Sequence, residues 1–288
     1  MPSTTPAATD ISRPSTGPTA EPIAASPINN AAPQTIAAAP TLPIGERILL
    51  YAGLAALTAL AWLYLVRMPM TPQDLGGLGA RMLSALPPRL ADLWLTFMMW
   101  AVMMVAMMVP SASPMVMAYA RVASARGGHP ALRVWLFASG YIAIWTLFSA
   151  AATAIQFALL RWSLISNALV TTPLASAAIL AATGIYQLTP LKQVCLGRCQ
   201  SPIGFLMTHW RDGAGGALRM GLMHGAFCAG CCWMLMALLF VAGVMNLAWV
   251  AAISVFALLE KVTSWGRAIA NVSGIALIAC AIAIALRR

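Results

Sequence analysis

The sequence has very little charge for its length. Only 8% of its 288 residues are charged and 61% are hydrophobic, whereas a soluble domain carries about 25% charged residues. A chain with so few charges cannot cover a globular surface with polar groups, so lipid must replace water around much of it. The composition therefore predicts an integral membrane protein in contact with membrane lipid.

The sequence also lacks the phosphate-binding pattern Gly-x-x-x-x-Gly-Lys-Ser/Thr and any soluble domain large enough to hydrolyse ATP. Any transport by this chain is therefore expected to be passive, gradient-coupled or dependent on a partner. The net charge of +10 comes from 17 Lys and Arg against 7 Asp and Glu. Because the basic residues lie mainly between apolar segments, they are expected to set membrane orientation, and we expect no nucleic-acid partner.

Two regions differ in composition. Residues 1–44 are rich in Pro, Ala, Ser and Thr and predict a disordered tail. Residues 45–288 predict one all-α domain, a polytopic transmembrane helical bundle. Its apolar segments are 47–66, 92–120, 133–160, 168–190, 217–243, 246–262 and 268–286. Because about 20 residues span a bilayer, we predict seven helices, or six if 246–262 is re-entrant.

Loop residues refine this topology. With seven spans, an inside tail leaves more Lys and Arg on the inner than on the outer side, which favours a cytoplasmic N-terminus. Pro110 and Pro114 predict that the second segment kinks or leaves the membrane near its end. The loop 67–91 suits either a short amphipathic surface helix or an irregular loop.

The most informative stretch is residues 219–236. As one helix at about 100° per residue, it places His224 at zero, Cys228 near 40°, Cys231 near −20° and Cys232 near 80°. Met220 falls near −40° on the same face. Thiolate and thioether ligands select Cu(I), while Zn(II) also accepts His and Cys. The stripe predicts a transition-metal site, with thiol redox chemistry and plain packing as the alternatives.

Methionine is concentrated in the second segment. Met99, Met103 and Met107 follow i, i+4 spacing, and Met104 and Met108 extend the same stripe. Thioethers are soft ligands for Cu(I), so the stripe is a candidate relay facing the Cys/His helix. Adaptable filling of an apolar core is the alternative role.

Three further features concern cysteine and buried charge. Cys195 and Cys199 share a predicted cytoplasmic loop, where they would stay reduced and act as an inner metal acceptor. Cys280 is isolated and is expected only to pack. Glu260 precedes Lys261 at a predicted helix end, which indicates an interfacial ion pair, with a metal or proton site as the alternative role.

Several of these motifs resemble a known family. They are Met103-Met-Val-Ala-Met-Met-Val-Pro110, Tyr186-Gln-Leu-Thr-Pro-Leu-Lys192, Ser201-Pro-Ile-Gly-Phe205, His209-Trp-Arg211, Gly221-Leu-Met-His-Gly-Ala-Phe-Cys-Ala-Gly-Cys-Cys-Trp233 and Met245-Asn-Leu-Ala-Trp249. Across roughly residues 92–286 the chain is similar to an uncharacterised bacterial family described as predicted metal-binding integral membrane proteins. The resemblance implies metal binding in a bacterial inner membrane and no particular substrate.

Together these features predict a membrane protein that binds a soft transition metal for transport or transfer. Copper as Cu(I) is favoured and Zn(II) is the alternative, with a metal chaperone or a membrane subunit as possible partner. A thiol-disulfide oxidoreductase using Cys228 and Cys231 is a rival function, and a structural assembly subunit without metal is another. A non-enzymatic role is favoured, and no residue is assigned to catalysis.

Overall fold

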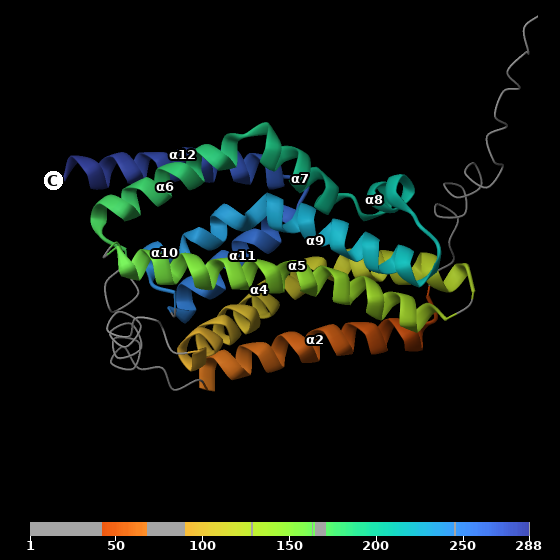
Figure 1. Cartoon of the computed structure of the whole chain (residues 1–288). Coiled ribbons are helices and arrows are strands. Elements are labelled where there is room, and N and C mark those ends of the chain that lie inside the picture. Colours follow the sequence, from red (N-terminus) through yellow and green to blue (C-terminus); the bar gives the residue numbers. More distant parts are fainter. Residues whose placement is uncertain are drawn as a thin grey trace, which may run out of the picture.

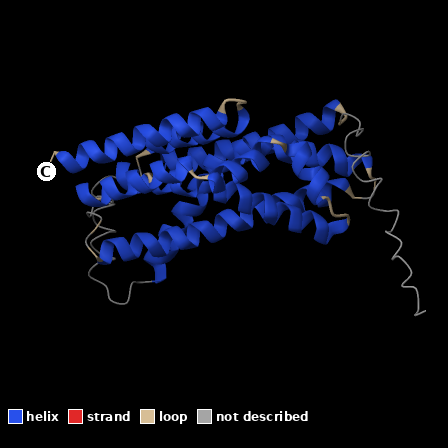
Figure 2. Cartoon of the chain, turned by 90° about the horizontal axis from the view of Figure 1, so that it is seen from above, coloured by secondary structure: helices blue, strands red, loops and turns tan. Residues whose placement is uncertain are grey.

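The computed structural model describes residues 42–67, 90–127, 129–162, 164, 171–244 and 246–287. Over these residues the chain is helical and contains no strand (Figure 2). The predicted all-α bundle is therefore confirmed. Residues 1–41 of the predicted tail and residues 68–89 of the predicted loop lie outside the described residues.

The helices form one elongated bundle. They are α2 (Ile44–Arg67), α4 (Leu90–Ala125), α5 (Pro130–Arg161), α6 (Pro173–Leu188), α7 (Pro190–Gln200), α8 (Pro202–His209), α9 (Gly213–Ala237), α10 (Leu239–Ala242), α11 (Leu247–Val262) and α12 (Gly266–Leu286). Figure 1 shows α2 along one side of the bundle and α12 with α6 along the other, with α9 between them. The helix α9, which carries the Cys/His stripe, therefore lies inside the bundle.

Five helical stretches in the described part of the chain are long and apolar enough to cross a membrane. They are α2, α4, α5, α9 with α10, and α12. The pair α6–α7, bent by 64°, adds a sixth if it forms one span. The predicted span 246–262 appears as α11 with 16 residues, which is shorter than the roughly 20 residues that a crossing needs. The architecture is compatible with a membrane protein and supports the lower of the two predicted numbers of helices.

Helix α4 continues as one helix from Leu90 to Ala125 through both of its prolines. Pro114 has no N–H and cannot donate to the carbonyl of Pro110. Ser113 replaces that donor, because its Oγ donates to Pro110 O at 2.8 Å. The nearby carbonyl of Met108 accepts a hydrogen bond from the Tyr141 hydroxyl of α5 at 3.0 Å. Side-chain donors thus reach two carbonyls of this turn, and one of them ties the turn to α5.

Helices α5 and α9 approach closely at glycines. A Cβ atom on Gly140 would lie 2.6 Å from Leu218 O, and a Cβ atom on Gly221 would clash with Phe137 O. Small residues at such crossings let two backbones come into contact. This crossing holds Tyr141 of α5 beside the sulfur-bearing face of α9.

A buried ion pair joins the other side of the bundle. Lys192 Nζ of α7 lies 2.8 Å from Glu260 Oε2 of α11, and the side chains are 0% and 2% exposed. Gln187 of α6 donates to Glu260 Oε1 at 3.1 Å and to Ser273 Oγ of α12 at 3.1 Å. The predicted interfacial pair of Glu260 with Lys261 is therefore wrong, because consecutive helical residues point about 100° apart. Glu260 instead pairs with Lys192 in the interior.

An exposed ion pair closes the opposite end, where α4 ends and α9 begins. Asp212 Oδ1 accepts from Trp210 Nε1 at 2.8 Å and from Arg126 Nη1 at 2.9 Å. The Arg126 guanidinium also lies 4.7 Å from the centre of the Trp210 ring. The hydrogen bond from Trp210 and then the contact with Arg126 hold the pKa of Asp212 below its ordinary value, although partial burial opposes them.

This depressed pKa predicts a small acid-dependent loss of stability. The contribution of Asp212 is present above about pH 4, the ordinary Asp value, and is lost as the pH falls through the lowered folded-state pKa. Because Asp212 is 65% exposed, we expect less than about 1 kcal/mol. Below about pH 4 the thermal stability of the native chain should fall by this contribution. The stability of Asp212→Asn, which has no carboxyl group at this position, should show no such fall. Identical acid profiles of the two proteins would contradict the assignment.

Candidate metal site

The predicted continuous helix over residues 219–236 is confirmed, since α9 runs unbroken from Gly213 to Ala237. Its stripe faces the protein interior. His224 is 3% exposed, Cys228 2%, and Cys231 and Cys232 1% each. Long apolar side chains of neighbouring helices cover this face, so the imidazole and the thiols are withdrawn from lipid and water alike.

The thiol of Cys228 is the centre of the cluster. Its Sγ lies 3.0 Å from Lys261 Nζ of α11 and 3.2 Å from the Tyr141 hydroxyl of α5. The same Tyr141 hydroxyl donates to Met108 O on α4. Helices α5 and α11 therefore meet α9 at one sulfur atom, and Tyr141 links that sulfur to α4.

A second sulfur contact joins α9 to α4. Cys232 Sγ lies 3.8 Å from Met108 Sδ. Two sulfur ligands about 2.3 Å from one tetrahedral metal lie about 3.8 Å apart. Lys261 Nζ is also 3.6 Å from Met108 Sδ. Lys261 Nζ therefore links the thiol of Cys228 to the thioether of Met108, which in turn contacts the thiol of Cys232.

Helix α7 adds a thiol from outside this stripe. Cys199 is partly buried, and its thiol interacts with those of Cys228 and Cys231. Cys195, one turn earlier, is 9% exposed. Its thiol packs against Gly230 of α9, where a Cβ atom would lie only 3.0 Å from the sulfur. The predicted exposed loop is thus a packed helix. Cys199 belongs to the central cluster, while Cys195 packs behind α9.

The thiols are not yet arranged as a coordination shell. Cys231 Sγ and Cys232 Sγ donate to the carbonyl of Cys228 at 3.1 Å and 3.0 Å. In the described part of the chain, no three Cys, His, Asp or Glu side chains are grouped to hold a metal ion. Cys232 Sγ and Met108 Sδ lie at the distance of two ligands of one metal, and Met108 contributes a thioether. Soft ligands of this kind suit Cu(I), and a rotation about χ1 would free each thiol from its carbonyl.

The methionine stripe of α4 is buried in the same core as the thiols. Met99 and Met107 are 0% exposed and Met103 is 1% exposed. The contact with Cys232, however, comes from Met108, which the sequence pattern placed only at the edge of the stripe. Lys261 and Tyr141 were not predicted as part of the site. A lysine inside an apolar segment was the available signal for Lys261.

His224 lies apart from the thiols. Its ring is stacked against Tyr141, with ring centres 5.6 Å apart, and against Phe137 at 6.0 Å. Phe205 of α8 meets it edge-on at 5.6 Å. Its buried Nδ1 has no hydrogen-bond partner. The imidazole therefore offers a free ligand atom one turn before Cys228 in an aromatic surround.

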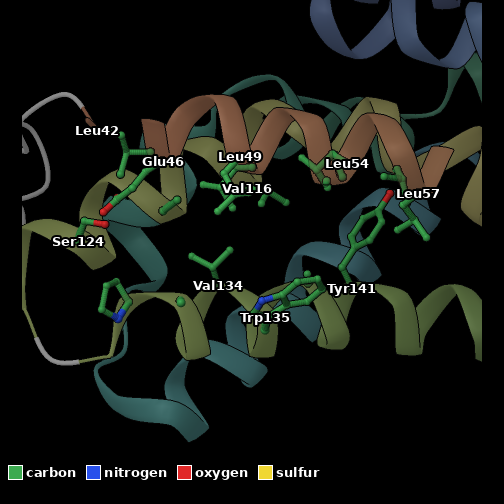
Figure 3. Close-up of a pocket in the computed structure, with 18 of the residues that line it drawn as sticks. Leu42, Glu46, Leu49, Leu54, Leu57, Val116, Ser124, Val134, Trp135 and Tyr141 are labelled. Carbon is green, nitrogen blue, oxygen red and sulfur yellow. The ribbon is translucent and has the colours of Figure 1, made fainter. Parts of the chain in front are cut away.

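An apolar cavity lies on the other side of Tyr141. It measures about 530 Å³ and is lined by residues of α2, α4 and α5. Figure 3 shows Tyr141 and Leu57 near one end, and Glu46 and Ser124 at the other. Its walls are otherwise almost entirely apolar, so it offers no ligands for a metal. Tyr141 separates it from the sulfur cluster.

The comparisons with known proteins identify a family for this chain. No curated protein and no solved structure matches the chain. The sequence model of one family, described as "PpoB2: Copper chaperone", matches residues 97–284. That range contains the sulfur residues of α4, α7 and α9 together with Lys261. It confirms the metal-related part of the predicted resemblance and names the metal. The chain belongs to the PpoB2 copper chaperone family, and its function concerns copper.

Proposed function

We propose that this chain binds Cu(I) within a bacterial inner membrane and transfers it to a partner. The ion is cargo, held by the sulfur atoms of Cys228, Cys232 and Met108. The long apolar helices support a membrane location, and the loop charges favour a cytoplasmic N-terminus. A metal chaperone or a membrane subunit would give or receive the copper.

One observation carries this proposal, the 3.8 Å contact between Met108 Sδ and Cys232 Sγ beside the thiol of Cys228. Thiolate sulfur binds both Cu(I) and Zn(II), and Zn(II) sites add imidazole or carboxylate. Thioether sulfur is a soft donor that favours Cu(I). The nearest carboxylate in sequence to the cluster's lysine, Glu260, is bonded to Lys192. The donor set therefore supports copper over zinc.

Two ladders of ligands lead to this centre. On α4, Met99, Met103 and Met107 repeat every fourth residue, which is about 6 Å of helix rise per step. On α9, Met220 and His224 precede Cys228 with the same spacing. Each ladder offers soft or imidazole donors in otherwise apolar surroundings. We propose that copper moves along them by exchange between successive ligands.

Cys199 has a different role from the predicted inner acceptor. Its interaction with Cys228 and Cys231 supports a place in the central site, as an additional thiol supplied by α7. Because α7 is bent away from α6 by 64°, a small change of that bend would alter the distance from Cys199 to α9. We propose that Cys199 joins the copper when it is exchanged. Cys195 is left as a packing residue.

The copper content of the purified full chain tests the proposal. After loading with Cu(I) under reducing conditions, the native chain should hold bound copper, and Cys228→Ser with Cys232→Ser should lose at least about 90% of it, because two of three soft ligands are gone. Cys280→Ser is the matched control, since Cys280 is exposed and outside the cluster. Equal copper in the double variant and the native chain would refute the site.

The same proteins separate the rival function. A thiol-disulfide oxidoreductase should form a reversible disulfide between Cys228 and Cys231 when challenged with a quinone or a thiol oxidant. A copper site should keep its thiols reduced, and bound Cu(I) should protect them from alkylation. Mass spectrometry after alkylation, with and without copper, distinguishes these results. Alkylation at the same rate in both states would contradict copper binding by these thiols.

A further inference from the structure

We propose that the ammonium group of Lys261 occupies the copper position in the copper-free protein and that Cu(I) must displace it. This inference rests on the proposed function of the Cys228, Cys232 and Met108 site. Lys261 would act as an internal competitor that weakens copper binding. It would thereby make the copper exchangeable with a partner.

The contacts of Lys261 are those expected of a cation held by soft ligands. Its Nζ lies 3.0 Å from Cys228 Sγ, 3.1 Å from Ser111 Oγ and 3.6 Å from Met108 Sδ. An ammonium group has three N–H donors, so these three contacts use all of them. Two of the three partners are proposed copper ligands. The ammonium and the ion would therefore compete for the same sulfur atoms.

No carboxylate lies within ion-pair distance of Lys261 in the described part of the chain. The residue is 5% exposed, and in the described part of the chain neither ion pair includes it. Its neighbour Glu260 is bonded to Lys192 at 2.8 Å and to Gln187 at 3.1 Å. A buried charge without a counter-charge is strongly unfavourable. Cys228 Sγ, at 3.0 Å, makes the shortest of the three contacts that stabilise the ammonium group of Lys261.

The same sulfur atoms cannot bind Cu(I) and the ammonium group of Lys261 at the same time. Cu(I) and the ammonium group each carry one positive charge, and at ligand distances they repel each other strongly in a medium of low polarity. Binding is therefore an exchange of one monovalent cation for another. The lysine side chain has a flexible four-carbon stem, and Ser111 remains as a hydroxyl partner for the displaced ammonium.

This exchange has a consequence for affinity. Copper must break the contact of Lys261 with Cys228 and Met108 before it binds, so part of the binding free energy is spent on that displacement. Removing the ammonium should therefore tighten copper binding. A purely structural lysine would behave oppositely, because its loss would loosen the site and weaken binding.

Competition with a chromophoric Cu(I) chelator, on the full chain in detergent micelles, tests the inference. Lys261→Leu should bind Cu(I) at least tenfold more tightly than the native chain and release it to the chelator more slowly. Lys261→Arg is the matched control, since it retains the positive charge, and its affinity should stay within about threefold of the native value. Weaker or unchanged binding by Lys261→Leu, with normal thermal unfolding, would overturn the inference.

A second variant tests the same inference if Lys261→Leu does not fold. Ser111→Ala removes one of the three ammonium contacts and leaves all the sulfur ligands in place, so it should bind Cu(I) two- to fivefold more tightly. Affinity equal to or below the native value would count against the inference. Failure of the native chain itself to bind Cu(I) would instead refute the proposed function on which the inference rests.

Discussion

Replacement of Glu260 by Gln is expected to lower the free energy of unfolding by about 3–5 kcal/mol. The carboxylate of Glu260 is the counter-charge of Lys192, whose side chain is 0% exposed. Glutamine keeps the shape of the side chain and its capacity to accept from Gln187, but it leaves the ammonium of Lys192 buried without a counter-charge. The loss is therefore electrostatic rather than a loss of packing.

Thermal unfolding of the detergent-solubilised full chain measures this effect. Asp212→Asn is the matched control, since it makes the same acid-to-amide change in a pair whose acid is 65% exposed, where about 0–1 kcal/mol is expected. The double replacement Lys192→Met with Glu260→Leu should restore much of the stability, because it removes both charges. A loss of stability in Glu260→Gln no larger than that in Asp212→Asn would contradict the assignment of a buried ion pair.

Replacement of Gly221 by Val is expected to destabilise the bundle by about 3 kcal/mol, at the upper end for overpacked cores, and to abolish copper binding. The first atom of the new side chain would meet the backbone carbonyl of Phe137. Because that neighbour is backbone, it cannot rotate away, and α5 and α9 must separate. Separation moves Tyr141 away from Cys228, which its hydroxyl contacts at 3.2 Å.

Gly215→Val is the matched control for this variant. Gly215 lies in the first turn of the same helix α9, and a Cβ atom there meets nothing within 4 Å. It should unfold within about 1 kcal/mol of the native chain, as a helical glycine replacement at an open position does. Normal copper content in Gly221→Val would mean that the crossing of α5 and α9 does not position the site.

The long helices of this chain follow from the length of its apolar segments. Residues 47–66 and 92–120 are long apolar runs, and a helix satisfies the backbone groups of such a segment in lipid without a partner strand. The inward stripe of His224, Cys228 and Cys232 also follows from helical geometry, since the spacing of four residues returns to the same face. These predictions needed only local information, and the structure confirms them.

The partners of that stripe did not follow from the sequence. Met108 rather than Met107 contacts Cys232, because the rotation of α4 about its axis depends on packing against α5 and α11. Cys199 reaches the thiols because α7 packs against α9 after a bend of 64° between α6 and α7. Neither the rotation nor the bend is encoded in the spacing of residues within one segment.

The amino-acid sequence by itself determined that this protein is an all-α bundle of apolar helices and that one helix presents His and Cys on one face, because those properties depend on composition and a period of 3.6 residues. Only the tertiary structure decided that Glu260 pairs with Lys192 and that Lys261 turns to the sulfur of Cys228. Consecutive residues of a helix face different neighbours, and which neighbour each one meets is set by how separate helices pack.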